Sequence, residues 1–283
     1  GLPFEQQVLE LARLFRGRLT ALVADWMRVG YCQGNFNSDN CAAGGFTLDY
    51  GPFGFCEPFD PSFQPWTGGG EHFSFFNQPV AAEANYHMFW ASLRPLLADH
   101  SDALARLDQL REGFSDAMNH ELDIMWAGKL GLSHDDTGLV NELLELLVLS
   151  KADYTLFFKQ LSDIPADHAV LQESFYLPSS AQRDVRWRQW LDRWRAQIMR
   201  NGELSATSAA MKRINPSITW REWLIAPAYR QAECGDNTLI QELQQVFSQP
   251  YDELSGELGA KYNRLKPREF FDAGGVSHYS CSS

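Results

Sequence analysis

The sequence predicts a mainly α-helical fold. Apolar residues recur every three or four positions through most of the chain, the spacing that places them on one face of a helix. Strand-like sequence is almost absent, since only Phe46-Thr47-Leu48 is typical of a short strand. Hydrophobic residues make up 45% of the 283 residues, which is enough to bury a sizeable core. We therefore expect a helical bundle interrupted by one irregular region.

The first helix is predicted over Phe4–Val29, and Gly30 should end it. The region Tyr31–Gly70 is rich in Gly, Asn, Asp and Pro, so we expect an irregular segment in which functional loops lie. The tail, Pro250–Ser283, is predicted to be extended chain that wraps the bundle. The helical period returns after Pro79 in the segments Val80–His100, Ser101–Leu130, Thr137–Leu161, Ala181–Met199, Ser205–Arg213, Thr219–Gly235 and Asn237–Ser248.

Two of these helix starts carry residues that are typical N-caps, namely Ser101-Asp102 and Asp135-Asp136-Thr137. Asn141 and Asp153 lie within helical segments, and we interpret them as buried polar anchors of the bundle.

Three tryptophans share one face of the predicted helix 181–199, interleaved with arginines. Such a stripe can bind nucleic acid or an acidic peptide. Helical spacing of tryptophan is more typical of core packing with arginine stems laid across it, and we favour packing. The residues are Trp187, Trp190 and Trp194.

Charge and hydropathy exclude several classes of protein. The formal net charge is −12, and no run of Lys and Arg could follow a phosphate backbone, so nucleic acid is not an expected partner. No stretch approaches the roughly 18 to 20 apolar residues of a membrane-spanning helix, and the start of the chain does not resemble a signal peptide. A cytoplasmic protein of bacterial type is predicted, with no membrane partner.

The five cysteines show neither CxxC nor paired metal-ligand spacing, so neither a disulfide framework nor a structural zinc site is predicted. Cys32, Cys41 and Cys234 are expected to be ordinary thiols in a reducing compartment.

Two stretches of the irregular region combine acids with an amide. One ends in Asp39-Asn40, and the other opens with Asp49-Tyr50-Gly51. An Asn amide oxygen and an Asp carboxylate are hard ligands of the kind that Mg²⁺ prefers, which leaves a second acid to accept a proton or orient a nucleophile. Gly51 would let the chain turn away after Asp49. Taken alone, an Asp-Asn pair in a glycine-rich loop is more typical of a simple turn.

The longer string resembles the selenoprotein O family. Its members read close to His-Gly-Val-x-Asn-Thr-Asp-Asn and then Thr-Ile-Asp-Tyr-Gly-Pro-Phe-Gly-Phe at this spacing, and the seven residues Asp49–Phe55 all match. Similar blocks recur along nearly the whole chain, at residues 26–31, 77–79, 139–144, 153–158, 214–216, 232–236, 250–253 and 280–283. The chain is therefore identified as a member of this family.

The resemblance implies that residues 1–283 form the C-terminal lobe of a kinase-like fold, with a C-terminal helical extension and tail. A short strand would carry the Asp-Tyr-Gly metal turn, and the catalytic and metal loops would lie within residues 31–57. It implies a protein adenylyltransferase, which moves AMP from ATP to Ser, Thr or Tyr hydroxyls of client proteins. By matching positions, Asp39 is the proton acceptor, Asn40 and Asp49 bind Mg²⁺ or Mn²⁺, and Asp49 also lies near the nucleotide.

This chain departs from the family pattern in two ways that bear on activity. Nothing in it resembles the glycine-rich loop or the phosphate-contacting Lys of the family's N-terminal lobe, so that lobe is missing here and we expect the chain alone not to turn over ATP. Gln33 replaces the family's His, which is expected to brace the catalytic loop. The alternative is a non-catalytic, pseudokinase-like helical module that binds partners or senses redox state.

The terminal Cys281 stands where eukaryotic relatives carry selenocysteine, and the family implies a regulatory disulfide from this tail to the loop after the metal site. The usual partner position holds Pro65, and Cys56 is the nearest substitute. Because disulfide geometry tolerates a narrow range of Cα separations, a free terminal thiol is the default expectation.

Overall fold

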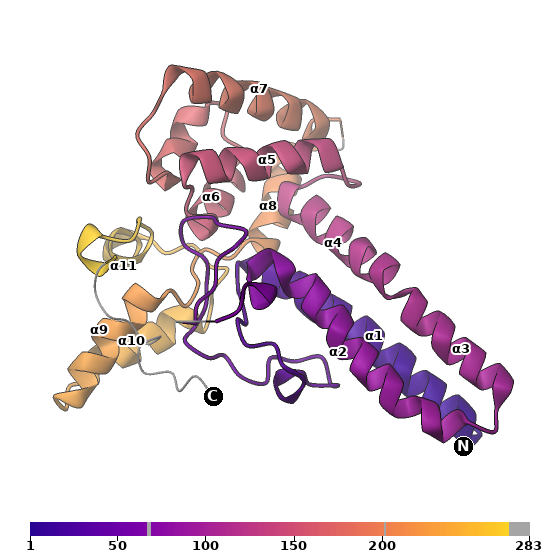
Figure 1. Cartoon of the computed structure of the whole chain (residues 1–283). Helices are drawn as coiled ribbons and strands as arrows, with labels where there is room; N and C mark the ends of the chain where they lie inside the picture. Colours follow the sequence, from indigo (N-terminus) through magenta and orange to yellow (C-terminus); the bar gives the residue numbers. More distant parts are fainter. Residues whose placement is uncertain (67–68, 201, 272–283) are drawn as a thin grey trace.

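A computed structural model describes residues 1–66, 69–200 and 202–271, and it is mainly helical as predicted (Figure 1). Within these ranges the only β pairing consists of isolated bridges, and no sheet forms. None of the helices in the described ranges is both long and apolar enough to cross a membrane.

Helix α1 spans Phe4–Val29, the predicted bounds. It ends at Gly30, whose φ of +78° is the left-handed conformation that closes many helices. α1 contacts α2 (Gln78–Leu93), α3 (Ser101–Glu112) and α4 (Phe114–Leu130). Together these four helices form the elongated arm at the lower right of Figure 1.

Two predicted helices of this arm are shorter than expected. The segment predicted over 80–100 becomes α2 followed by a 3₁₀ turn at Arg94–Leu97, because Pro95 has no N–H for the α-helical ladder. The segment predicted over 101–130 divides at Gly113 into α3 and α4. The predicted Ser101-Asp102 cap is wrong, since α3 starts after His100 without a side-chain cap.

The segment predicted over 137–161 also divides, into α5 (Thr137–Ser150) and α6 (Tyr154–Leu161). Lys151 between them adopts a left-handed φ of 45°, and Asp153 then caps α6 by accepting the N–H of Leu156 at 3.0 Å. The predicted Asp136 cap of α5 is confirmed, since its carboxylate accepts the N–H of Leu139 at 2.9 Å. Asp153 is fully buried as expected, whereas Asn141 is exposed and is not an anchor.

Helix α7 (Ala181–Ile198) packs on α5 and carries the tryptophan stripe. All three indoles are fully buried, which confirms core packing. Each indole N–H also has an acceptor: Ser150 Oγ for Trp187, Leu139 O for Trp190 and Leu130 O for Trp194. Burial without an unpaired N–H makes the stripe part of the core.

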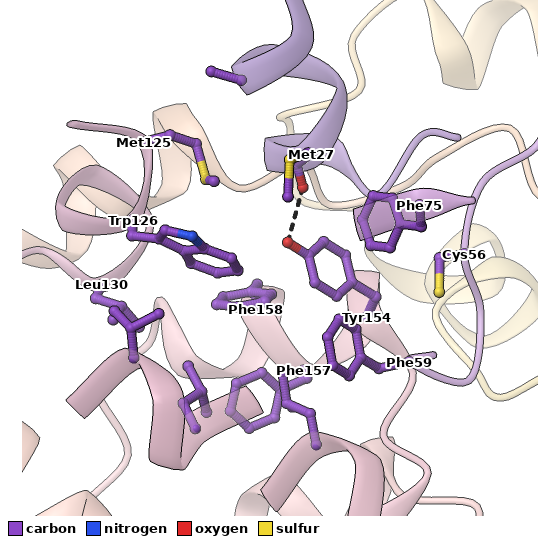
Figure 2. Close-up of a cluster of buried hydrophobic side chains, with 14 of the residues drawn as sticks. Met27, Cys56, Phe59, Phe75, Met125, Trp126, Leu130, Tyr154, Phe157 and Phe158 are labelled. Atoms are coloured by element: carbon purple, nitrogen blue, oxygen red, sulfur yellow. Dashed lines mark hydrogen bonds between the residues drawn. The ribbon is translucent and has the colours of Figure 1, made fainter. Parts of the chain in front are cut away.

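The main core lies where α1, α4, α6 and the loop after residue 55 meet (Figure 2). Tyr154 sits at its centre and donates its hydroxyl to the carbonyl of Met27 at 2.8 Å, near the end of α1. Its ring stacks on Phe59 at 5.6 Å and meets the edge of Phe75 at 5.7 Å. The core therefore fixes the end of α1, from which the irregular region starts.

The C-terminal helices are α8 (Leu204–Ile214), α9 (Glu222–Glu233), α10 (Thr238–Phe247) and α11 (Gly256–Tyr262). α9 and α10 pack together around a small core of their own, and we call α9–α11 with that core the C-terminal unit. The predicted extended tail is wrong over α11, because Leu258 and Tyr262 lie one helical turn apart and both pack on that core.

The predicted strand Phe46–Leu48 is also wrong. Thr47 forms a single antiparallel bridge with Cys41, and its hydroxyl accepts the indole N–H of Trp26 at 2.8 Å. Phe46 and Leu48 are exposed. The described part of the chain places no further strand beside it, so the pairing does not extend into a ladder.

Candidate functional site

The two acid-bearing stretches start from one pair of antiparallel segments. Tyr31 and Phe55 form an antiparallel bridge, the N–H of Cys32 donates to Gly54 O at 2.7 Å, and the N–H of Cys56 donates to Gly30 O at 2.7 Å. The chain enters this pair from α1 and returns through it toward the main core. The loop with Asp39 and Asn40 and the turn with Asp49 therefore both lie between these two paired segments.

The Asp49–Phe55 segment is a turn in which a local hydrogen bond orients the side chain of its first residue. One carboxylate oxygen of Asp49, Oδ1, accepts the N–H of Gly51 at 2.8 Å, and the side chain is exposed. Gly51 has a φ of +51°, and a Cβ built there would lie 2.7 Å from the Trp66 ring. The predicted need for glycine after Asp49 is therefore confirmed, both by conformation and by space.

The residues Ser38–Asn40 form a short 3₁₀ turn. Asp39 is exposed, and its carboxylate makes no hydrogen bond within residues 1–66, 69–200 and 202–271. The amide nitrogen of Asn40 donates to Asn35 O at 2.9 Å. That bond occupies the amide nitrogen, and the amide oxygen of Asn40 has no hydrogen bond within the described residues.

Gln33 connects the loop that carries Asn40 to the turn that carries Asp49. From the sequence it is notable only because it replaces the histidine expected at this position. Its side chain is buried, donates from Nε2 to Asp49 O at 3.2 Å, and accepts the N–H of Asn35 at Oε1 at 2.8 Å. Since Asn40 bonds Asn35 O, a continuous path runs from Asn40 through Asn35 and Gln33 to Asp49. A residue that both donates and accepts is needed in the middle, and glutamine provides both.

Replacement of Gln33 by methionine, which keeps similar bulk but neither polar group, should destabilise the chain by about 1–3 kcal/mol, because buried backbone groups lose their partners. Urea denaturation of the chain measures this. Gln33→His is the matched comparison, since it restores the family residue and a donor. If the free energies of unfolding of wild type and Gln33→Met agree within about 0.5 kcal/mol, the hydrogen bonds of Gln33 do not stabilise the loop and the turn.

A divalent cation fits the chemistry of Asn40 and Asp49. Both offer hard oxygens, neither side chain is buried, and the remaining oxygen of Asp49 makes no hydrogen bond to the described part of the chain. Within that part no group of three or more His, Cys, Asp or Glu could hold a metal. Two protein oxygens suit Mg²⁺, which keeps several waters and takes phosphate oxygens from its substrate.

Tyr31 also holds the Asp49–Phe55 turn by a hydrogen bond. Its hydroxyl donates to Asp49 O at 3.2 Å, beside the Gln33 bond to the same carbonyl. Burial, reinforced by the Asp49 carboxylate, raises the pKa of Tyr31 well above its usual value. The tyrosine therefore stays protonated and remains a donor to the turn.

The sequence also proposes Cys56 and Cys281 as redox residues. Cys56 is buried, its thiol lies 3.3 Å from Pro58 O, and burial raises its pKa far above the ordinary range of a thiol. A thiol that is neither exposed nor ionised is a poor partner in disulfide exchange. Cys281 lies outside the described residues, so the pairing stays a prediction.

Near the turn lies a buried charged cluster, of which the sequence indicated only Asp153, as a buried polar anchor. Asp153 and Arg221 form an ion pair at 3.2 Å, with exposed side-chain fractions of 0% and 1%. Lys266 approaches Glu57 at 3.5 Å, and the other oxygen of Glu57, Oε2, is buried without a partner in the described structure. Tyr176 donates to Asp153 at 3.1 Å and faces the same carboxylates. These five residues are at least 23 positions apart in the chain, which explains why no local motif reveals the cluster.

Burial raises the pKa of Glu57 to about 7; Lys266 and Arg221 oppose the shift, and Asp153 adds to it. Between its ordinary value of 4.5 and about 7, the folded chain binds more protons at Glu57 than the unfolded chain. The stability contributed by this group is therefore full at acid pH and is lost as pH rises through about 7.

Glu57→Gln should remove this dependence and raise the free energy of unfolding at pH 8 by about 2–3 kcal/mol relative to wild type. Denaturant titrations of both chains at pH 5.5, 7 and 8.5 test it. Parallel curves for wild type and variant over this range would contradict the assignment of Glu57 as the titrating group.

Comparison with known proteins places most of this chain in one family. The family model described as protein adenylyltransferase SelO matches residues 6–248. A protein nucleotidyltransferase YdiU from Xanthomonas axonopodis pv. citri is 34% identical over 276 residues, which cover 94% of this chain and 52% of that protein. Its counterpart from Tolumonas auensis is 35% identical over 272 residues, 93% of this chain and 51% of that protein. The chain thus spans about half the length of the curated relatives it matches.

Proposed function

Because the chain belongs to the SelO family of protein adenylyltransferases, we propose that the full-length protein moves AMP from ATP to Ser, Thr or Tyr hydroxyls of client proteins. The described part then corresponds to the helical C-terminal lobe of a kinase-like fold. The observation that carries the proposal is the hydrogen-bond path from Asn40 through Asn35 and Gln33 to Asp49. It couples the two proposed cation ligands to each other, although eight residues separate them in sequence.

In this proposal Asn40 and Asp49 would hold Mg²⁺ or Mn²⁺, with Asp49 also beside the nucleotide. When bound, the cation neutralises phosphate charge on ATP. Asn40 contributes its amide oxygen, while its amide nitrogen is held by Asn35 O. Asp49 contributes the carboxylate oxygen that is not occupied by the N–H of Gly51.

Asp39 is the proposed proton acceptor. The client hydroxyl oxygen attacks the α-phosphorus, pyrophosphate leaves, and the hydroxyl proton passes to the Asp39 carboxylate. An exposed carboxylate without internal hydrogen bonds in the described structure is free to meet a hydroxyl from another protein. Its place beside Asn40 on the same 3₁₀ turn keeps acceptor and cation close.

Incubation of the full-length protein with ATP labelled at either the α- or the γ-phosphate tests the reaction. AMP transfer retains the α label on protein and loses the γ label, whereas phosphorylation does the reverse. The 283-residue chain alone is a useful control, since no stretch of it resembles a phosphate-binding loop, and we expect no label on it.

Asp39→Asn distinguishes the proposed proton acceptor from the proposed cation ligands. We expect it to abolish protein labelling while ATP and Mn²⁺ still bind, since the cation ligands remain. Absence of any label on protein with the full-length wild type would reject AMP transfer and favour the alternative of a non-catalytic, partner-binding module.

A further inference from the structure

The Asp49–Phe55 turn contains an unusual backbone conformation. Phe53 has a φ of +55°, in the left-handed region that residues with a Cβ seldom adopt. The turn is closed on both sides of this residue, by the N–H of Phe53 donating to Tyr50 O at 3.1 Å and that of Phe55 donating to Phe53 O at 2.8 Å. Such a conformation persists only where surrounding groups hold it.

A stack of three aromatic rings holds Phe53 from outside the turn. Its ring lies on Trp220 with centroids 5.4 Å apart and planes within 14°. Trp220 also stacks on Phe247 of α10, with centroids 4.5 Å apart and planes within 18°. The stack connects the turn that carries Asp49 to the C-terminal unit, which has a separate core.

Trp220 is itself fixed by the residues on either side of it. The hydroxyl of Thr219 bonds that of Thr155 at 2.9 Å, and Arg221 forms the buried ion pair with Asp153. Asp153 caps α6 and Thr155 lies in its first turn, and this helix packs in the main core. These contacts hold the backbone on either side of Trp220 against the bundle, while the indole itself is 39% exposed and stacks between Phe53 and Phe247.

We propose that Trp220 is a positioning residue: by stacking on Phe53 it keeps the turn in its left-handed conformation and thereby sets the direction of the Asp49 carboxylate. This inference rests on the proposed role of Asp49 as a cation ligand. Without the indole, Phe53 is free to return to negative φ. Only three residues separate it from Asp49, so its relaxation redirects the acid.

The main test compares Trp220→Ala with Trp220→Phe in the full-length protein. The alanine variant should raise the Mn²⁺ concentration for half-maximal AMP transfer about tenfold, and phenylalanine, which can still stack, should stay within about threefold. Phe247→Leu is the matched control, because Phe247 also stacks on Trp220 but makes no ring contact with Phe53 in the described residues. A role in packing alone would instead make Phe247→Leu and Trp220→Ala equivalent.

A double-mutant cycle with Phe53→Gly isolates the backbone effect. Glycine adopts positive φ without strain, so Trp220→Ala should cause much less loss of Mn²⁺ affinity in that background. An equal loss in both backgrounds overturns the inference.

Hydrogen exchange gives a readout that does not need activity. Amides of residues 50–55 should exchange at least about tenfold faster in Trp220→Ala than in wild type, while those of α5 stay unchanged. If wild type transfers no AMP yet exchange in the turn responds as expected, the proposed function fails and the positioning role stands. Unchanged exchange in the turn rejects the positioning role whatever the activity.

Discussion

Replacing Asp49 by alanine in the full-length protein is expected to lower AMP transfer by about 10²- to 10³-fold, the loss typical of removing one group that stabilises transition-state charge. Stability should change by no more than about 0.5 kcal/mol, because the side chain is exposed and, within the described residues, its carboxylate bonds only the N–H of Gly51. Label transfer from ATP and urea denaturation measure the two quantities.

Asp60 provides a matched control for this experiment. It is also exposed, and it accepts the N–H of Ser62 two residues on at 2.8 Å, the same local bond that Asp49 makes with Gly51. Asp60→Ala should leave transfer unchanged. Comparable losses in both variants would mean that loss of a local turn, and not of a cation ligand, explains the Asp49 result.

The largest effect on stability is expected for Arg221→Met. Removing the guanidinium leaves Asp153 charged and buried, which typically costs about 3–5 kcal/mol. Burial already raises the pKa of Asp153, with Arg221 opposing that shift. In the variant the folded-state pKa should rise further, so the defect should shrink as pH falls and the carboxylate takes up a proton.

Asp153→Asn in the Arg221→Met background tests this explanation. The neutral amide removes the uncompensated charge but can still cap α6, so part of the lost stability should return. Denaturant midpoints at pH 5 and pH 8 for the single and double variants decide the matter. A defect that is equal at both pH values would show that Arg221 acts through packing and its bonds to Tyr262 and Arg264.

Local sequence signals predicted those parts of the fold that local physics controls. The bounds of α1 follow from its apolar period and Gly30, and Asp136 was found as a cap because its bond spans only three residues. The break at Lys151 was missed, since neither Gly nor Pro marks it. α11 was missed because its helical face is stabilised by packing on a distant core.

In the candidate site, too, residues in local motifs could be predicted and residues that act through distant contacts could not. Asp39, Asn40 and Asp49 could be proposed from sequence because motif and spacing are local, and their roles stay predictions. From the sequence, Gln33 was interpreted as the loss of a bracing histidine. Its connecting role depends on bonds to Asn35 and Asp49 that form only in the folded chain.

Trp220 and Glu57 gave no sequence signal. Their partners Phe53 and Lys266 lie more than 100 residues away in the chain. Contacts of that span are set by topology, which periodicity does not encode.

We propose that Asn40 and Asp49 bind one cation. The direct measurement is Mn²⁺ affinity by electron paramagnetic resonance in the presence of ATP, for the full-length wild type, Asn40→Ala, Asp49→Asn and the double variant. If the ligands share the ion, the double variant should lose at least about 1.4 kcal/mol less than the sum of the single losses. Losses that add to within about 0.5 kcal/mol would place the two side chains at independent sites and contradict the account.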